Sequence, residues 1–167
     1  MKIEDNFLDQ KVFDDLQTFM MGHDFPWFYQ DAIDHVNQLD KFMFATRLYL
    51  HDVPCSPYFE DLKTTFFKKL NLISIYRIKA NLLTRTPNIV ENEFHIDIAG
   101  IREEILKQLT TSIFYVNTNN GYTIFEDGTK GETIANRIVT FPANTKHTGT
   151  SCTDEKIRIV INFNYFK

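Results

Sequence analysis

Two histidines and one aspartate in the second half of the chain are residue types that bind metal ions. His95 and Asp97 are separated by one residue, so an extended backbone would send both side chains from the same face of a sheet. His147 would have to join them from a neighbouring strand. Two histidines and one carboxylate on one face of an octahedral ion leave three positions open, an arrangement typical of non-haem Fe(II) sites. The alternative, that these are ordinary polar residues of an edge strand and a turn, stays open at this point.

The last extended run, 156–166, carries a basic residue among apolar ones. Its residues alternate between two faces, one with Ile157, Ile159, Ile161, Phe163 and Tyr165 and the other with Arg158, Val160, Asn162 and Asn164. On an amphipathic surface strand, Arg158 would face solvent. If its face instead lines the interior of a barrel, the buried guanidinium needs a partner, and a carboxylate matches its planar fork.

The elements that would position these side chains are short extended runs, which follow one another from Asn71 onward and are separated by Asn, Asp, Gly and Pro turns. The sequence predicts eight strands, at 72–82, 93–98, 107–117, 122–126, 131–135, 137–142, 146–151 and 156–166. The Asn120-Gly121 pair favours a tight hairpin. The segment 101–108 would also allow a helical turn. Eight antiparallel strands suit a double-stranded β-helix, or jelly roll.

The first part of the chain has helical spacing instead. Apolar residues recur at helical intervals over 8–20, with Asp9 as a candidate N-cap, and again over 58–70. Pro26 cannot continue the first helix. We therefore expect one domain, 1–167, in which a mostly helical part, 1–70, packs on a jelly-roll core, 71–167. The fold class is mainly β with N-terminal helices.

Composition narrows the classes of partner. The net charge is −4 and the chain shows no basic stripe, which argues against nucleic acid and anionic membranes as partners. Cys55 and Cys152 lack CxxC spacing, which indicates reduced thiols in a cytoplasmic protein. No apolar run approaches the roughly 20 residues that span a bilayer, and the N-terminus does not resemble a signal peptide. A small molecule or another protein is the expected partner, and an exposed edge strand could pair into a homodimer.

In this order, the motifs resemble the 2-oxoglutarate- and Fe(II)-dependent dioxygenases, specifically the prolyl-hydroxylase-like branch and its small phage-encoded members. His95 and Asp97 match the family's H-x-D, His147 its distal histidine, and Arg158 the arginine of its closing strand. Tyr115 matches the tyrosine that commonly helps this arginine. The opening Ile-Glu-Asp-Asn-Phe-Leu, Phe-Pro-Trp-Phe-Tyr and Arg-Ile-Lys-Ala-Asn-Leu are similar to the phage-type members, whose proteins would work in the host cytoplasm.

The resemblance implies a reaction and a set of roles. His95, Asp97 and His147 would bind Fe(II), and Arg158 with Tyr115 would hold the far carboxylate of 2-oxoglutarate. Dioxygen and the keto acid would be consumed to hydroxylate a C–H bond of a peptide, prolyl-like, or of a small molecule, with release of succinate and CO2. Ascorbate is a further expected cofactor. Tyr115 as a plain core aromatic remains an alternative.

The remaining polar residues have weaker assignments. Asn81 is expected to contact co-substrate or substrate, and Lys79 and Arg77 would share its face. Asn162 and Asn164 could orient the carboxylate site. Three histidines without ligand spacing are treated as bystanders: His23, His35 and His51.

Two rival functions use the same fold. A cupin-type jelly-roll metal protein, an isomerase or hydrolase, would bind metal but give Arg158 no carboxylate to hold. A non-catalytic binding module would bind no metal tightly. The sequence names neither the substrate nor the oligomeric state, and fold-level analogy is weak support for proline as the target.

Overall fold

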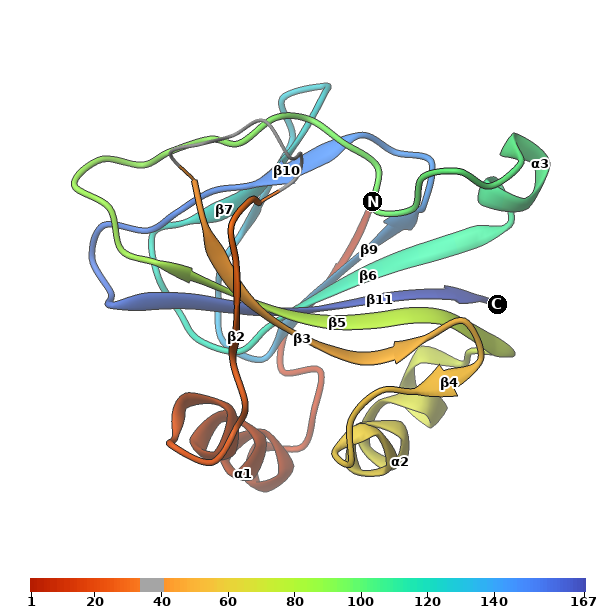
Figure 1. Ribbon diagram of the computed structural model, residues 1–167, viewed down its shortest axis with the longest axis horizontal. Helices are drawn as coiled ribbons and strands as arrows, with labels where there is room; N and C mark the ends of the chain where they lie inside the picture. Colours follow the sequence, from red (N-terminus) through yellow and green to blue (C-terminus); the bar gives the residue numbers. More distant parts are fainter. Residues whose placement is uncertain (34–40) are drawn as a thin grey trace.

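Two antiparallel β-sheets face each other in the computed structural model, which describes residues 1–33 and 41–167 (Figure 1). The major sheet runs in the order β1 (Lys2–Glu4), β9 (Arg137–Pro142), β6 (Leu109–Tyr115), β11 (Ile157–Phe166), β5 (Ser74–Thr84), β3 (Met43–Leu50) and β2 (Phe28–Gln30), and β4 (Val53–Pro54) pairs with β3. The minor sheet runs in the order β10 (His147–Gly149), β7 (Tyr122–Phe125) and β8 (Lys130–Glu132). This architecture confirms the predicted jelly roll.

Two helices cover the outer face of the major sheet, α1 (Gln10–Met21) and α2 (Phe59–Leu70) (Figure 1). Each turns an apolar stripe towards the strands: Phe13 and Met20 are buried on α1, and Phe59, Leu62, Phe66 and Leu70 on α2. This layer forms the main core, because burial of such a stripe is what stabilises a helix of this length. Asp9 occupies the expected N-cap position of α1, but its side chain makes no capping hydrogen bond.

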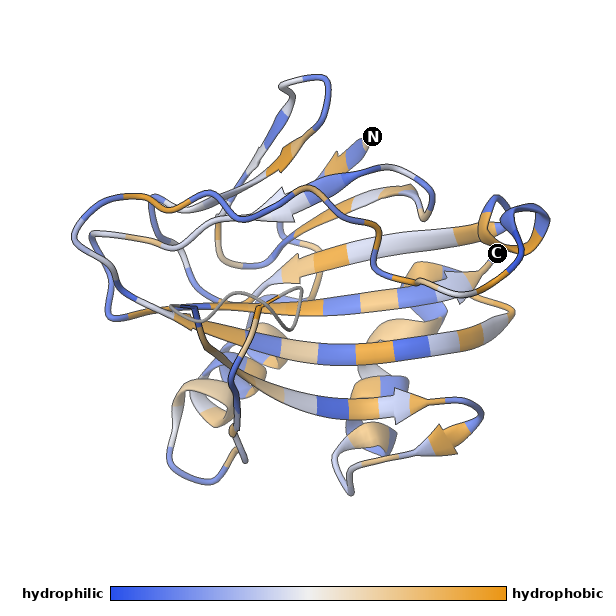
Figure 2. Ribbon diagram, turned by 45° about the horizontal axis from the view of Figure 1, so that its top comes forward, coloured by the Kyte–Doolittle hydropathy of each residue, from blue (hydrophilic) through white to orange (hydrophobic). Residues whose placement is uncertain are grey.

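β11 lies in the middle of the major sheet and is buried on both faces. Its outward residues, among them Ile159, Ile161 and Phe163, belong to the helix-covered core. Its inward residues include Arg158, only 3% exposed, and Asn162, 8% exposed. The alternation of apolar and polar residues along the strands is visible in Figure 2. Arg158 therefore faces the interior, and the alternative of a solvent-facing arginine is wrong.

The sequence-based boundaries hold for most strands, but three expectations fail. The tight hairpin expected at Asn120-Gly121 does not form, because β6 pairs within the major sheet and β7 within the minor sheet. The expected strand 93–98 is not one: His95 forms only an isolated bridge with His147, so this segment is a loop pinned at one point. Residues 1–70 are not mostly helical, because they also contain β1, β2, β3 and β4. β3 and β1 are members of the major sheet, so the boundary at residue 70 does not separate a helical part from a β core.

Two smaller features complete the fold. The helical turn allowed for 101–108 exists as α3 (Glu103–Leu106). α2 ends where Asn71 adopts a left-handed conformation, with φ of 52°, which asparagine tolerates better than most residues. Within the described ranges, every helix is too short or too polar to cross a membrane.

Candidate metal and carboxylate site

The candidate site is a cavity of about 340 Å³ between the two sheets. Its floor is formed by inward residues of β5 and β11, and its opposite wall by β7, β10 and the loop that carries the H-x-D. The lining includes four of the five residues expected to bind metal or carboxylate, namely His95, Asp97, His147 and Arg158, but not Tyr115. Residues far apart in the sequence therefore meet in one place.

His95, Asp97 and His147 are brought together by a short backbone bridge. The amide of His95 donates to the carbonyl oxygen of His147 at 3.0 Å, and the reverse bond has the same length. One ligand atom from each residue lies within 4.8 Å of the others. The Nε2 atoms of both histidines are 3.9 Å from Oδ1 of Asp97. Asp97 and His147 are almost completely buried.

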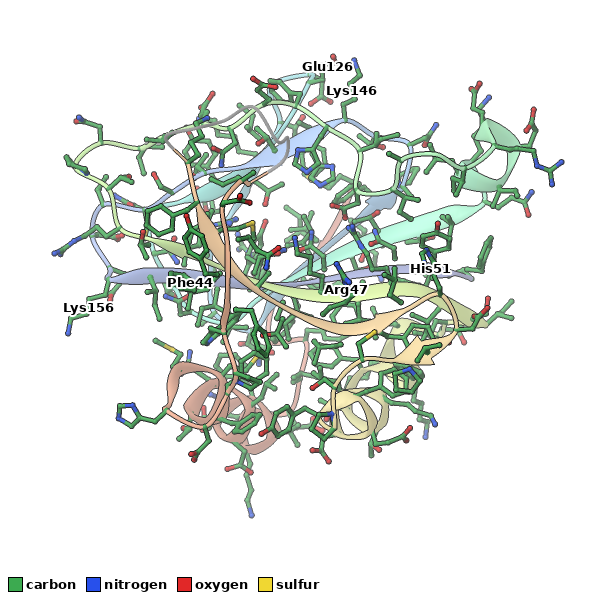
Figure 3. The ribbon with its side chains drawn as sticks, in the orientation of Figure 1. Phe44, Arg47, His51, Glu126, Lys146 and Lys156 are labelled. Atoms are coloured by element: carbon green, nitrogen blue, oxygen red, sulfur yellow. The ribbon has the colours of Figure 1, made fainter. Side chains whose placement is uncertain are left out.

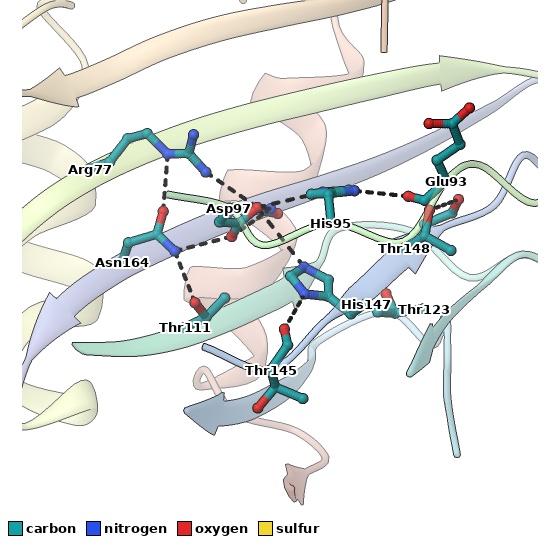
Figure 4. A network of polar contacts seen from close by, with 12 residues as sticks. Arg77, Glu93, His95, Asp97, Thr111, Thr123, Thr145, His147, Thr148 and Asn164 are labelled. Carbon is teal, nitrogen blue, oxygen red and sulfur yellow. Dashed lines mark hydrogen bonds and ion pairs between the residues drawn. The ribbon is translucent and has the colours of Figure 1, made fainter. Parts of the chain in front are cut away.

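Backbone carbonyl groups orient both imidazoles (Figure 4). Nδ1 of His95 lies 3.0 Å from the carbonyl oxygen of Glu93, and Nδ1 of His147 lies 3.1 Å from that of Thr145. A carbonyl oxygen can only accept, so each Nδ1 carries a proton, and Nε2 is the nitrogen of each ring that faces Asp97. Metal-binding histidines are typically held in this way.

Asp97 is held in place by cationic and amide donors (Figure 4). Nη2 of Arg77 lies 3.2 Å from Oδ1, and Nδ2 of Asn164 donates to Oδ2 at 3.0 Å. Burial alone would raise the pKa of Asp97, but the charge of Arg77, helped by His147, Asn164 and His95, outweighs it and lowers the pKa from 3.8 to about 2. The carboxylate is therefore ionised at neutral pH and available to a cation.

This donor set fits ferrous iron. Two imidazole nitrogens and one carboxylate oxygen converge from one side, and the cavity leaves space on the other side. Two histidines and one carboxylate with open positions are the ligands expected for non-haem Fe(II). The three expected ligand residues are thus placed together, and within the described ranges they form the one such cluster of His, Cys, Asp and Glu.

Arg158 lies on the same cavity wall with neutral partners only. Its Nε donates to Oγ1 of Thr133 at 3.0 Å and its Nη2 to Oγ1 of Thr123 at 3.3 Å. In the described part of the chain, no carboxylate lies within ion-pair distance of it. Burial lowers its pKa below the usual value for arginine, with an opposing contribution from Tyr115. A buried guanidinium with donors to spare is a binding group for an anion.

Two glycines leave room for this guanidinium. A Cβ added to Gly121 would lie 2.8 Å from Cδ of Arg158, and one added to Gly149 would lie 3.3 Å from Nη1. Larger residues at these positions would push the arginine from its place.

Tyr115 takes a different position from the one expected. It is fully buried, does not line the cavity, and places its hydroxyl 2.9 Å from Oγ1 of Thr123 and 3.2 Å from the carbonyl oxygen of Gly131. The guanidinium carbon of Arg158 is 5.6 Å from its ring centroid. Tyr115 thus supports Arg158 and Thr123 from behind, and Thr123 is the hydroxyl that lines the cavity.

Some of the other polar residues expected at the site line the cavity, and one contacts Asp97 from outside the lining. Asn81, Lys79, Arg77 and Asn162 line the cavity, and Asn164 contacts Asp97 from below it. Asn164 also accepts from Nε of Arg77 at 3.0 Å. Asn162 and Asn164 thus contact the metal-binding carboxylate of Asp97. The sequence suggested instead that they would orient the carboxylate of the co-substrate.

The histidines expected to be bystanders lie away from the cavity lining where the structure describes them. His51 follows β3 in a turn (Figure 3), and its ring is 6.2 Å from that of Tyr76. His23 follows α1 in the sequence and is exposed. His35 lies outside the described residues.

Three residues of the site were not found from sequence: Thr123, Thr133 and Asn92. Their types are common in loops and strands, and no spacing marks them. Period-two alternation in the run 122–126 could have placed Thr123 on an inward face, but nothing in the sequence says which sheet faces it.

No protein-family model and no curated protein matches the chain, whereas solved structures do. One is the prolyl hydroxylase from Trichoplax adhaerens in complex with a hypoxia inducible factor peptide, with 11% identity, 99% of this chain and 82% of that one covered, and a TM-score of 0.64. Another is the viral collagen prolyl hydroxylase from Paramecium bursaria Chlorella virus-1 in its 2OG complex, with 16% identity, 99% and 95% covered, and a TM-score of 0.55.

A third similar structure is that of a protein named for a different reaction. It is the non-haem α-ketoglutarate-dependent epimerase SnoN from nogalamycin biosynthesis, with 11% identity, 99% and 76% covered, and a TM-score of 0.68. At these identities the comparisons establish the fold. They confirm the resemblance to prolyl hydroxylases and other 2OG-Fe(II) oxygenases at that level, and the name of the third shows that the fold hosts more than hydroxylation.

Proposed function

We propose that the protein is an Fe(II)- and 2-oxoglutarate-dependent dioxygenase that hydroxylates a C–H bond. One observation carries the proposal: a single cavity holds both the His95, Asp97 and His147 cluster and a buried Arg158 whose hydrogen-bond partners, among the described residues, are hydroxyl groups. A metal site alone would suit many enzymes. A second, cationic site in the same small cavity suits a co-substrate with a carboxylate at its far end.

At the carboxylate end, Arg158 and Thr123 would bind the 5-carboxylate of 2-oxoglutarate. Arg158 supplies the charge, and its Nη groups supply charge-assisted donors. Thr123 supplies a hydroxyl that already contacts Nη2 of Arg158 at 3.3 Å. Tyr115 would act through these two residues by fixing the position of Thr123, and its hydroxyl stays protonated because burial raises its pKa.

At the metal end, His95, Asp97 and His147 would hold Fe(II) through Nε2, Oδ1 and Nε2. Ferrous iron with the keto acid supplies the activation of dioxygen, and the products are hydroxylated substrate, succinate and CO2. Arg77 and Asn164 hold the Asp97 carboxylate in one orientation. The protein's own contribution is to place the co-substrate and to shield the reaction from solvent.

Asn81 lies between the two ends of the cavity. On β5 it pairs with Val160, the β11 residue between Arg158 and Asn162. Its Oδ1 is buried without a hydrogen-bond donor among the described residues. We assign Asn81 to the middle of the bound keto acid or to the substrate beside it.

The proposal is tested by release of succinate from 2-oxoglutarate in air with Fe(II), which needs no substrate because such enzymes turn over slowly without one. The wild-type protein should release succinate. His147→Ala should abolish it while the circular dichroism spectrum stays native, because the metal would lose one of three ligands. A fully active His147→Ala variant would remove His147 from the metal site.

The two rival functions give other results in the same assay. A cupin-type enzyme would bind Fe(II) but neither bind nor consume 2-oxoglutarate. A non-catalytic module would bind no iron, and a chelator would leave its melting temperature unchanged, whereas a metal-bound native state is stabilised by mass action. Involvement of O2 and ascorbate, a phage origin, a cytoplasmic location and a homodimer stay predictions.

A further inference from the structure

Among the described residues, three asparagines that line the cavity, Asn81, Asn92 and Asn162, have a buried amide oxygen without a hydrogen-bond donor. Asn92 and Asn162 both line the cavity, and the Oδ1 atom of each is buried without a partner among the described residues. Buried polar atoms are nearly always paired, since an unpaired one carries a desolvation penalty. Two such acceptors in one ligand-sized cavity point to a ligand that brings donors.

The orientation of both amides is fixed by their nitrogens. Nδ2 of Asn92 donates to the carbonyl oxygen of Gly149 at 3.0 Å, and Nδ2 of Asn162 lies 3.4 Å from both carboxylate oxygens of Asp97. Rotating either amide by 180° would place oxygen against oxygen, so the unpaired atom is an acceptor in each case. The Oδ1 of Asn81 is likewise unpaired among the described residues, but no hydrogen bond from its nitrogen to a described residue fixes the orientation of that amide.

The co-substrate cannot satisfy these acceptors. At neutral pH, 2-oxoglutarate carries two carboxylates and a keto group, all of which accept hydrogen bonds and none of which donates. The donors must therefore come from ordered water or from the primary substrate, and a substrate that supplies them would displace that water. The cavity volume, about 340 Å³, lies near the lower limit for ligand pockets of roughly 300–1,000 Å³, so the substrate or its inserted part is small.

The charge of the cavity wall favours some hydrogen-bond donor groups of a substrate over others. Among the described residues, the lining contains the cations Arg77, Lys79 and Arg158 and the carboxylate of Asp97. An ammonium donor would meet like charge there. A hydroxyl group is neutral, donates to an amide oxygen and can also accept from a cationic side chain. A prolyl residue brings no N–H of its own.

We propose that the substrate is a small neutral polyol, at least two of whose hydroxyl groups donate to Oδ1 of Asn92 and Oδ1 of Asn162. The assignment rests on the proposed function, because the polyol would lie beside bound 2-oxoglutarate. Asn92 and Asn162 are then specificity residues, and Asn162 ties the substrate position to the metal-binding Asp97.

The test measures melting temperature for the wild-type protein with Fe(II) and 2-oxoglutarate under anaerobic conditions. Three probes are myo-inositol, ribitol and methyl glucoside, and two comparators are free proline and a blocked prolyl peptide. At least one polyol should raise the melting temperature in a concentration-dependent way, and neither comparator should match it.

The variants identify the residues responsible. Asn92→Ala should weaken the binding of that polyol about ten-fold, the scale of one lost hydrogen bond, and Asn162→Ala should weaken it as well. Asn88→Ala, the same substitution at an exposed position of the same segment, should leave the affinity unchanged. If no polyol shifts the melting temperature, or if both cavity variants bind it as the wild type does, the assignment is overturned.

The visible band of iron-chelated keto acid, read in the same wild-type samples, separates the two levels of failure. A band without any polyol response overturns the substrate assignment and leaves the oxygenase proposal in place. Absence of the band overturns the oxygenase proposal and, with it, the polyol assignment.

Discussion

Arg77 and Arg158 come from neighbouring strands and line the same cavity, but their charges are compensated differently. Arg77, with 21% of its side chain exposed, has the carboxylate of Asp97 at 3.2 Å. Arg158 is only 3% exposed and contacts two threonine hydroxyls. Burial would favour the opposite distribution, since the more buried charge needs a counter-charge more. The difference indicates that Arg77 serves the metal end and that Arg158 is kept for a ligand.

The largest expected effect is on co-substrate affinity. Arg158→Ala should weaken binding of 2-oxoglutarate by roughly 2–5 kcal/mol, the scale for truncating one partner of a buried charge pair. Isothermal titration with the iron-loaded protein measures it. Arg158→Lys keeps the charge but not the planar fork, so its affinity for 2-oxoglutarate should lie between those of the wild type and Arg158→Ala. An unchanged affinity in Arg158→Ala would remove Arg158 from the co-substrate site.

The next effect separates the two arginines in the absence of any ligand. Arg77→Met should lower the free energy of unfolding by roughly 2 kcal/mol, because Asp97 would stay buried without its cation. The loss is smaller than the roughly 3–5 kcal/mol of a fully buried pair, because Arg77 is partly exposed. Arg158→Met removes a buried charge that has no counter-charge, so stability should stay level or rise. Urea unfolding of the metal-free protein gives both values, and the reverse order would contradict the comparison.

A pH effect of similar or smaller size follows from Asp97. Its pKa is lowered from 3.8 to about 2 in the folded protein, so its contribution is fully present above about pH 4 and is lost as the pH falls towards 2. The contribution is on the order of 2 kcal/mol. Between pH 5 and 2, the urea midpoint of the metal-free protein should fall more steeply for the wild type than for Asp97→Asn. Parallel curves for the two proteins would contradict this contribution of Asp97.

The smallest effect sharpens the account of Arg158. Gly149→Ala would place a Cβ 3.3 Å from Nη1 of Arg158, so the guanidinium must shift by a few tenths of an ångström. We expect a loss of about 1 kcal/mol or less in 2-oxoglutarate binding, about five-fold at most. The affinity of Gly149→Ala for 2-oxoglutarate is measured together with that of Arg158→Ala, and we expect a small loss. An affinity equal to that of the wild type would show that Gly149 does not position the arginine.

The residues that could be predicted from sequence are those whose chemistry and spacing are unusual together. His95, Asp97 and His147 required only an H-x-D and a distant histidine, and Arg158 required an alternating strand with a basic inward position. The resemblance to known oxygenases then ordered them. Tyr115 was placed in the right region, but its contact with Thr123 depends on how β6 and β7 face each other, which no local pattern specifies.

The features that were missed depend on tertiary contacts. The segment 93–98 reads as a strand, yet its backbone pairs with the minor sheet only at His95. β3 is a full member of the major sheet because it pairs with β5 from Phe44 to Leu50, and nothing nearby in the sequence shows that partner. The unpaired oxygen of Asn92 is visible only once the cavity is closed around it.

The most direct test of the central claim is an anaerobic titration of the metal-free protein with Fe(II) and 2-oxoglutarate, followed by visible absorption. Iron chelated by a keto acid gives a weak charge-transfer band, and no substrate is needed to see it. The band should appear in the wild type and be lost in His95→Ala. Iron binding without the band would contradict the oxygenase assignment and favour a cupin-type enzyme, and no iron binding at all would contradict an enzymatic role for this cavity.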